Sequence, residues 1–237
     1  MKKTATLYQH GTLALLVPGL LAGTLTMTEL LRHGDTGIGT GEGLDGELII
    51  LDGHPYQVNA HGDVCEVPGD FTLPFANVHY ADYQPLMTVL GASQADLNQQ
   101  IRALAQLDNA FFSVKVTGLF TAIRTRAVAK SEPPYQTLAQ AAQQQRVFSR
   151  GEVTGTLIGY YAPELYDGIA VAGFHDHFLA DDHSFGGHLL DFESVDGEVS
   201  VQPFATLEQH LPVDDQAYRQ HDFGADDITG DVHRAER

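Results

Sequence analysis

The sequence predicts an α/β or α+β protein with two lobes, mixed and antiparallel sheets, and a histidine-bearing β-hairpin in the C-terminal lobe. Three observations predict this fold. Short apolar segments separated by glycine turns recur along the chain, helical segments alternate loosely with them, and one late hairpin concentrates histidines. We expect an N-terminal α/β lobe over residues 1–135. A sheet-rich lobe over 136–237 would carry the hairpin and an acidic tail.

Composition supports a folded protein and excludes some partners. The chain has 237 residues, 43% of them apolar and 19% charged, which is enough to bury a sizeable core. The formal charge of -18 would repel nucleic acid and anionic membranes, so we expect neither as a partner. It does not exclude a small anionic substrate, because one buried arginine or a metal ion reverses the field inside a pocket.

The N-terminal pattern over residues 5–33 predicts a helix interrupted near Pro18, with Thr28 as a cap for the turn that follows. Lys2 and Lys3 before the apolar run LALLVPGLLAGT also resemble a signal peptide. The run is short, contains Pro18 and continues directly into TMTELLRHGD, which favours a folded segment. It is also shorter than the roughly 20 apolar residues of a membrane span.

Residues 47–67 read as two strands of a hairpin joined at Asp52-Gly53. The glycines before them contain a GxG pattern, but they precede a strand and no helix opens after them. This order is the reverse of a dinucleotide-binding motif. Cys65, the lone cysteine, has no disulfide partner within the chain and is interpreted as an ordinary thiol.

The clearest helix is predicted over residues 96–108, where apolar side chains recur every three or four positions: Leu97, Ile101, Leu104 and Leu107. Residues 111–129 follow as one long strand or a strand pair. Alternation places Arg124 and Arg126 on one face, although neither face is plainly the core.

A turn through Pro133-Pro134 leads into a glutamine- and alanine-rich helix, then into a run of short strands, and finally into the acidic tail with its weak helical pattern.

Four of the twelve histidines fall in the stretch GFHDHFLADDHSFGGHLLDF, residues 173–192. Residues two apart on a strand share a face, so His175 and His177 lie side by side. A symmetric hairpin about the loop ADDHSF brings His188 opposite His177, with Cβ atoms about 4.5–5.5 Å apart. His183 falls in the loop. Three imidazoles from two rigid strands suit a zinc ion and leave one coordination position open, as in catalytic sites.

A non-catalytic metal-binding module is the alternative, with cupin-like or sensing character. That alternative predicts a closed site in which His183 or Asp181 supplies a fourth ligand. The cupin pattern also requires a glutamate a few residues after the second histidine, where this chain has Asp181 and Asp182.

The chain resembles the α-acetolactate decarboxylase family. The resemblance is carried, in the same order, by LYQHGTLALLVPGLLAGTLTMTELLRHGDTGIGTGEGLDGELIILDG, by GLFTAIRTRAV with its following PPY, and by the histidine stretch. It runs from about Leu7 to the C-terminus. It implies a zinc enzyme that converts 2-acetolactate to acetoin and CO2, usually a homodimer of subunits with two α/β domains. Because the LYQ segment belongs to the folded body of this family, we expect a cytoplasmic protein.

The resemblance also implies the site residues. The metal ligands fall on His175, His177 and His188, and the remaining positions match as follows: Glu47 in LDGE, Arg126 in TR, Thr40 in GT, and Glu236 near the C-terminus. Thr40 and Arg126 would bind substrate, while Glu47 and Glu236 would form an acid-base pair. Zn2+ would stabilise an enediolate as a Lewis acid, Arg126 would orient the carboxylate, and a glutamate would protonate one face.

Overall fold

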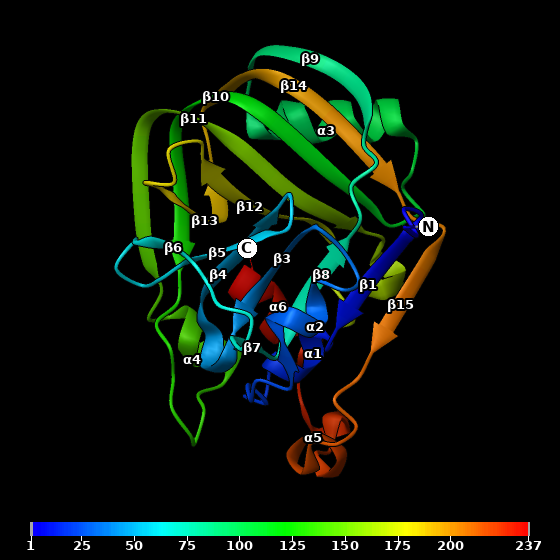
Figure 1. Cartoon of the computed structure of the whole chain (residues 1–237), viewed down its shortest axis with the longest axis vertical. Helices are drawn as coiled ribbons and strands as arrows, with labels where there is room; N and C mark the ends of the chain where they lie inside the picture. Colours follow the sequence, from blue (N-terminus) through cyan, green and yellow to red (C-terminus); the bar gives the residue numbers. More distant parts are fainter. Residues whose placement is uncertain (1, 237) are drawn as a thin grey trace.

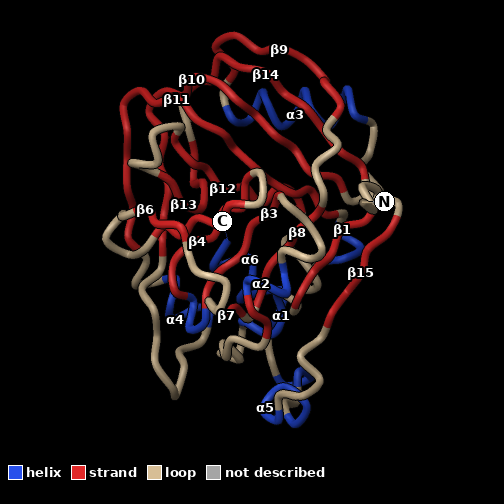
Figure 2. Tube along the Cα trace, in the orientation of Figure 1, coloured by secondary structure: helices blue, strands red, loops and turns tan. Residues whose placement is uncertain are grey.

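The computed structural model describes residues 2–236, except for the side chains of residues 233, 234 and 236. Two large sheets dominate the molecule, and short helices lie at their ends and between them (Figures 1 and 2). One sheet has seven strands and the other has six. The mixed α+β architecture expected from the sequence is therefore confirmed.

The seven-stranded sheet is mixed. Its strands, in spatial order, are β15 (Thr206–His210), β1 (Thr6–His10), β8 (Phe75–His79), β3 (Thr36–Gly41), β4 (Asp45–Leu51), β5 (His54–Val58) and β6 (Val64–Glu66). Only β1 and β15 run parallel; the other neighbours are antiparallel. The predicted hairpin is β4 and β5, and its turn uses positive φ at Asp52 and Gly53. A small separate pair joins β2 (Leu25–Thr26) to β7 (Thr72–Leu73).

The six-stranded sheet is antiparallel and strongly curved. Its order is β11 (Arg146–Ala162), β12 (Gly173–Ala180), β13 (Gly186–Asp191), β10 (Phe112–Ala127), β14 (Ser194–Pro203) and β9 (Gln84–Ala92). Because β10 also pairs with β11 along its length, the strands β10, β11, β12 and β13 close into a ring. The segment expected as short strands after residue 146 is thus one 17-residue strand followed by the histidine hairpin.

The sheets exchange strands across the middle of the sequence. β9 precedes residue 135 yet belongs to the six-stranded sheet, and β15 follows it yet closes the seven-stranded sheet. The lobe boundary at 135/136 stays a prediction about folding units, and it does not coincide with the division between the sheets.

The long helix predicted over residues 5–33 is wrong. Thr6–His10 is strand β1, followed by the short helices α1 (Leu13–Leu16) and α2 (Met27–Leu30). The cap of α2 is also different from the one expected: Thr26, not Thr28, accepts the N–H of Glu29, whose carboxylate accepts the N–H of Thr26 in a capping box. The apolar residues of β1 are buried by pairing with β8 and β15.

The predicted central helix is confirmed as α3 (Gln94–Ala105), capped by Ser93. Its buried residues Leu97 and Ile101 pack on the six-stranded sheet, whereas Leu104 is exposed. The glutamine-rich helix is α4 (Leu138–Ala142), and the tail carries α5 (Gln216–Gln220) and α6 (Ile228–Glu236). Short 3-10 turns cover Glu42–Leu44 (η1), Glu164–Tyr166 (η2) and Phe223–Ala225 (η3).

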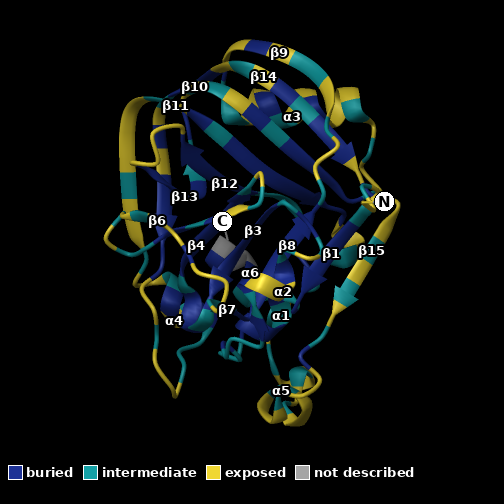
Figure 3. Ribbon diagram, in the orientation of Figure 1, coloured by how far each residue is buried: buried dark blue, intermediate teal, exposed yellow. Residues whose placement is uncertain are grey.

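The largest cluster of buried apolar residues lies between the six-stranded sheet and α3, and further clusters lie between the two sheets and around α1, α4 and α6 (Figure 3). The outer strand β9 and helix α5 carry most of their residues at the surface (Figure 3). Within residues 2–236, no helix combines the length and apolar character needed to cross a membrane.

Candidate metal centre

The hairpin β12–β13 places three histidines together in the predicted register. His177 lies directly opposite His188, and His175 precedes His177 on the same face of β12. The three ring centroids are 4.9–5.4 Å apart. One ligand atom from each ring lies within 4.8 Å of the others. Three imidazoles at this spacing can converge on one ion.

The glycine pair before His188 allows the hairpin to approach β10. Gly187 has φ +127°, and a Cβ there would lie 2.6 Å from the carbonyl oxygen of Arg126. Any side chain would therefore push β13 away from β10. The close approach makes Arg126 the cross-strand neighbour of His188. The sequence GGH thus positions a histidine beside a guanidinium.

The histidines are held in the form that binds a metal. Burial, and then the positive charge of Arg126, lower the pKa of His175 to about 3. The same two causes hold the pKa of His188 well below its usual value. Both rings are therefore neutral near pH 7, and a neutral imidazole keeps one nitrogen without a proton.

His177 is oriented by the other sheet. Its Nδ1 donates a hydrogen bond to the carbonyl oxygen of Leu48 on β4, at 2.9 Å. This bond requires the proton on Nδ1 and so leaves Nε2 as the ligand atom. Nothing in the local sequence around Leu48 signals this contact, because a backbone carbonyl carries no residue preference. Three convergent imidazoles, two of them neutral through burial and one oriented through Nδ1, fit a zinc ion.

Glu47 and Arg126 lie beside the histidines, buried at the junction of the sheets. Glu47 Oε1 is 3.5 Å from Arg126 Nη1, and Glu47 Oε2 is 3.5 Å from His177 Nε2. The carboxylate therefore faces both the guanidinium and a candidate ligand atom. Arg124, two residues earlier, is exposed and pairs with Asp191, and the β10–β13 register shifts between Arg124 and Thr125. Only one of the two arginines belongs to the site.

Thr40 is the cross-strand partner of Glu47, and its side chain is buried. Its hydroxyl donates to the carbonyl oxygen of Gly46 at 2.8 Å. With its proton used in this way, the oxygen can still accept a hydrogen bond from a ligand. The same contact fixes the backbone immediately before Glu47.

Glu236 is the last residue of α6, and its side chain lies outside the described part of the chain. The position of the helix is nevertheless clear from its buried residues. Val232 and Ala235 belong to the same apolar cluster as the leucines beside the histidines. The C-terminal helix therefore packs against the wall of the site.

The cavity at the histidines has a polar half and an apolar half. Its volume is about 40 Å³. The polar half consists of the six side chains predicted from the sequence: Thr40, Glu47, Arg126, His175, His177 and His188. The apolar half was not predicted and comes from widely separated segments: Leu13, Leu16, Leu44, Phe75, Val128 and Leu138. Scattered leucines are typical core residues, so no local pattern marks them as part of a site.

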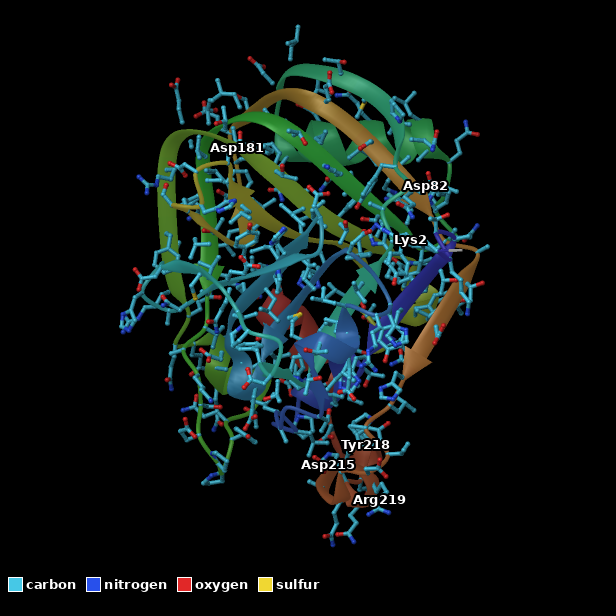
Figure 4. All side chains as sticks on the ribbon, viewed as in Figure 1. Lys2, Asp82, Asp181, Asp215, Tyr218 and Arg219 are labelled. Carbon is cyan, nitrogen blue, oxygen red and sulfur yellow. The ribbon has the colours of Figure 1, made fainter. Side chains whose placement is uncertain are left out.

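The alternative of a closed structural site depends on a fourth ligand from the hairpin loop. Asp181 and His183 are both exposed, and the ring of His183 packs 4.4 Å from that of Tyr56. Figure 4 shows Asp181 near the hairpin tip, in the upper part of the view. Among the described residues, neither belongs to the group of metal-ligating side chains. The fourth ligand expected by this alternative is therefore not found in the loop.

Fold and site together define an α+β protein whose two sheets enclose a candidate metal centre with an adjacent carboxylate and guanidinium. This is the arrangement of a metal-assisted enzyme. Residues 7–225 match the sequence model of the family described as alpha-acetolactate decarboxylase. The chain belongs to the α-acetolactate decarboxylase family and is a carboxy-lyase by that membership.

Individual relatives agree along the whole length. The alpha-acetolactate decarboxylase of Lactococcus lactis subsp. cremoris is 35% identical, with all of both chains covered. A Staphylococcus aureus structure, described as similar to alpha-acetolactate decarboxylase, has a TM-score of 0.93 at 39% identity and covers 98% of this chain and 100% of its own. The Bacillus subtilis alpha-acetolactate decarboxylase has a TM-score of 0.91 at 29% identity and covers 98% and 99%.

Proposed function

We propose that the protein catalyses the zinc-dependent decarboxylation of 2-acetolactate to acetoin and CO2, with His175, His177 and His188 as the zinc ligands. The observation that carries this proposal is the convergence of three imidazoles beside a buried carboxylate and guanidinium. Family membership supports the reaction class. Zinc, when bound, supplies a Lewis acid for the electrons left behind when the carbon–carbon bond breaks.

Arg126 orients the substrate carboxylate. Its guanidinium is buried and offers a planar pair of donors that matches a carboxylate. Orientation holds the carbon–carbon bond that breaks perpendicular to the plane of the keto group, where its electrons overlap the π system that accepts them. Thr40, whose proton is committed to Gly46, accepts a hydrogen bond from the substrate hydroxyl.

Glu47 and Glu236 form the acid-base pair. Glu47 Oε2 faces the candidate ligand atom of His177, so a proton held on this oxygen lies beside the reacting atoms. Val232 and Ala235 pack in the apolar cluster beside the cavity, so the helix that carries Glu236 reaches the site, which supports its inclusion in the pair. Protonation from one fixed side gives acetoin of a single configuration. The resemblance to the α-acetolactate decarboxylase family also supports a homodimer located in the cytoplasm.

The test is a substrate assay on the purified chain. We expect the zinc-loaded protein to release CO2 from 2-acetolactate, and chelation followed by zinc addition to remove and restore this activity. Elemental analysis of the same samples ties activity to metal content. If the zinc-loaded, folded chain releases no CO2 and chelation changes only its stability, the decarboxylase proposal is lost.

A further inference from the structure

The apolar half of the cavity contains one residue with an unusual backbone. Leu44 follows Gly43 in the turn η1 between β3 and β4, and both residues are left-handed, with φ of +61° and +73°. Glycine adopts this conformation readily, but a leucine does so only at a cost in free energy. The side chain of Leu44 is nevertheless buried against the cavity. An unfavourable backbone at a cavity wall indicates that the side chain itself has a role.

The turn that carries Leu44 is held in place by side-chain hydrogen bonds. Glu42 accepts hydrogen bonds from the hydroxyl of Tyr135 at 2.8 Å and from that of Thr72 at 2.9 Å. These contacts join the turn to the loop before α4 and to strand β7.

Backbone hydrogen bonds also hold the turn in place. The N–H of Gly43 donates to the carbonyl oxygen of Leu21 at 2.9 Å, and the N–H of Ser131 donates to that of Gly43 at 2.8 Å. The turn is thus attached to three separate segments. It cannot move outward to admit a larger group without breaking several hydrogen bonds.

The cavity itself is small. Its volume is about 40 Å³, and a cavity needs roughly 10–15 Å³ to hold a single water molecule. The polar groups of a 2-hydroxy-3-oxo acid match the histidines, Glu47 and Arg126. Its alkyl groups are then left for the apolar half, where a fixed leucine limits the space.

We propose that Leu44 is the specificity-determining residue of the site, and that it restricts the substrates to 2-hydroxy-3-oxo acids with short alkyl groups. The inference rests on the proposed function, because it names the size limit of that same reaction. The clamp of Glu42 with Tyr135 and Thr72 keeps Leu44 in position, so the limit is rigid.

The test compares Leu44→Ala and Leu44→Gly with the matched control Leu15→Ala. Leu15 is buried in the same apolar cluster as Leu44 but neither lines the cavity nor bonds to the turn. Leu44→Gly guards against misfolding, because glycine removes the backbone strain together with the side chain. Substrates are 2-acetolactate and two homologues lengthened by two carbons, one at C2 and one at the acyl group.

We expect both Leu44 variants to raise kcat/KM for at least one homologue, relative to 2-acetolactate, by about tenfold or more. The Leu15 control should leave this ratio unchanged. An unchanged ratio in folded, zinc-loaded Leu44 variants overturns the inference. An equal rise in the Leu15 control also overturns it, since general loosening of the core would then be the cause.

Binding gives a second measurement that does not require turnover. Titration calorimetry on the zinc-loaded proteins uses unreactive analogues in which the keto group is reduced to an alcohol, in the same series of chain lengths. A gain in relative affinity for a long analogue in the Leu44 variants supports the size limit even if wild-type protein releases no CO2, which would defeat only the proposed function. No gain, or no binding by any of the proteins, overturns the inference.

Discussion

Two groups of neighbouring histidines lie among the described residues, and they differ in where their ring nitrogens point. In the three-histidine centre, ligand atoms from His175, His177 and His188 converge within 4.8 Å beside a carboxylate. In the second group, His10 on β1 is fully buried and pairs with His210 at the end of β15. His10 Nδ1 lies 2.8 Å from His210 Nδ1, and His10 Nε2 lies 2.9 Å from the hydroxyl of Thr24.

Burial lowers the pKa of a histidine in each group, but only one group is a candidate metal site. Burial lowers the pKa of His10 to about 4, much as it lowers that of His175 to about 3. Both nitrogens of His10 are used in hydrogen bonds within the protein, so the ring connects β1 to the C-terminal strand. A candidate metal site therefore differs from a structural contact in that its ring nitrogens converge on one point. Burial and the number of histidines do not make this distinction.

The largest expected effect is the loss of metal in His177→Ala. Removing one of three ligands should lower zinc content below about one tenth of the wild-type level and abolish turnover. Elemental analysis and CO2 release measure the two effects. The matched control is His183→Ala at the exposed hairpin tip, which should keep both. Retention of metal or turnover in His177→Ala would contradict the ligand assignment.

Glu47→Gln tests whether the centre does chemistry beyond holding an ion. The amide keeps the shape of the side chain but cannot exchange a proton, so we expect kcat to fall by about 10²–10⁴-fold with zinc content unchanged. The measurement is steady-state CO2 release alongside elemental analysis. Full activity in this variant would remove Glu47 from the acid-base role, whereas loss of zinc would make it a ligand.

His10→Ala should change stability and leave zinc content and turnover intact. Loss of two buried hydrogen bonds and of the ring should lower the free energy of unfolding by about 2 kcal/mol or more at pH 7.5. Equilibrium urea unfolding measures this value. A loss of zinc in this variant would contradict the assignment of His10 to a purely structural role.

The wild-type protein and the His10→Ala variant should also differ in how their free energy of unfolding depends on pH. Because the pKa of His10 falls from 6.5 in the unfolded chain to about 4 in the fold, the unfolded chain binds the proton first. The stability that His10 contributes is therefore fully present above pH 6.5 and is lost as the pH falls towards 4. The variant lacks this loss, so its deficit should narrow by about 2 kcal/mol at pH 5. A deficit that stays constant between pH 7.5 and 5 would show that His10 does not titrate as expected.

The sequence by itself determined the elements whose pattern is local. Strand alternation and hairpin symmetry place His175, His177 and His188 together, since both depend only on nearby residues. The helix at 94–105 and the hairpin of β4 and β5 follow from short-range periodicity and a two-residue turn in the same way.

Tertiary structure alone decided the features that depend on distant partners. Residues 6–10 form a strand because they pair with β8 and β15, some 70 and 200 positions away, and no local pattern distinguishes that outcome from a helix. Arg126 is buried while Arg124 is exposed because β13 meets β10 with a register shift. The carbonyl of Leu48 and the leucines of the cavity reach the histidines only when the two sheets pack, so these contacts are properties of the fold and not of any segment.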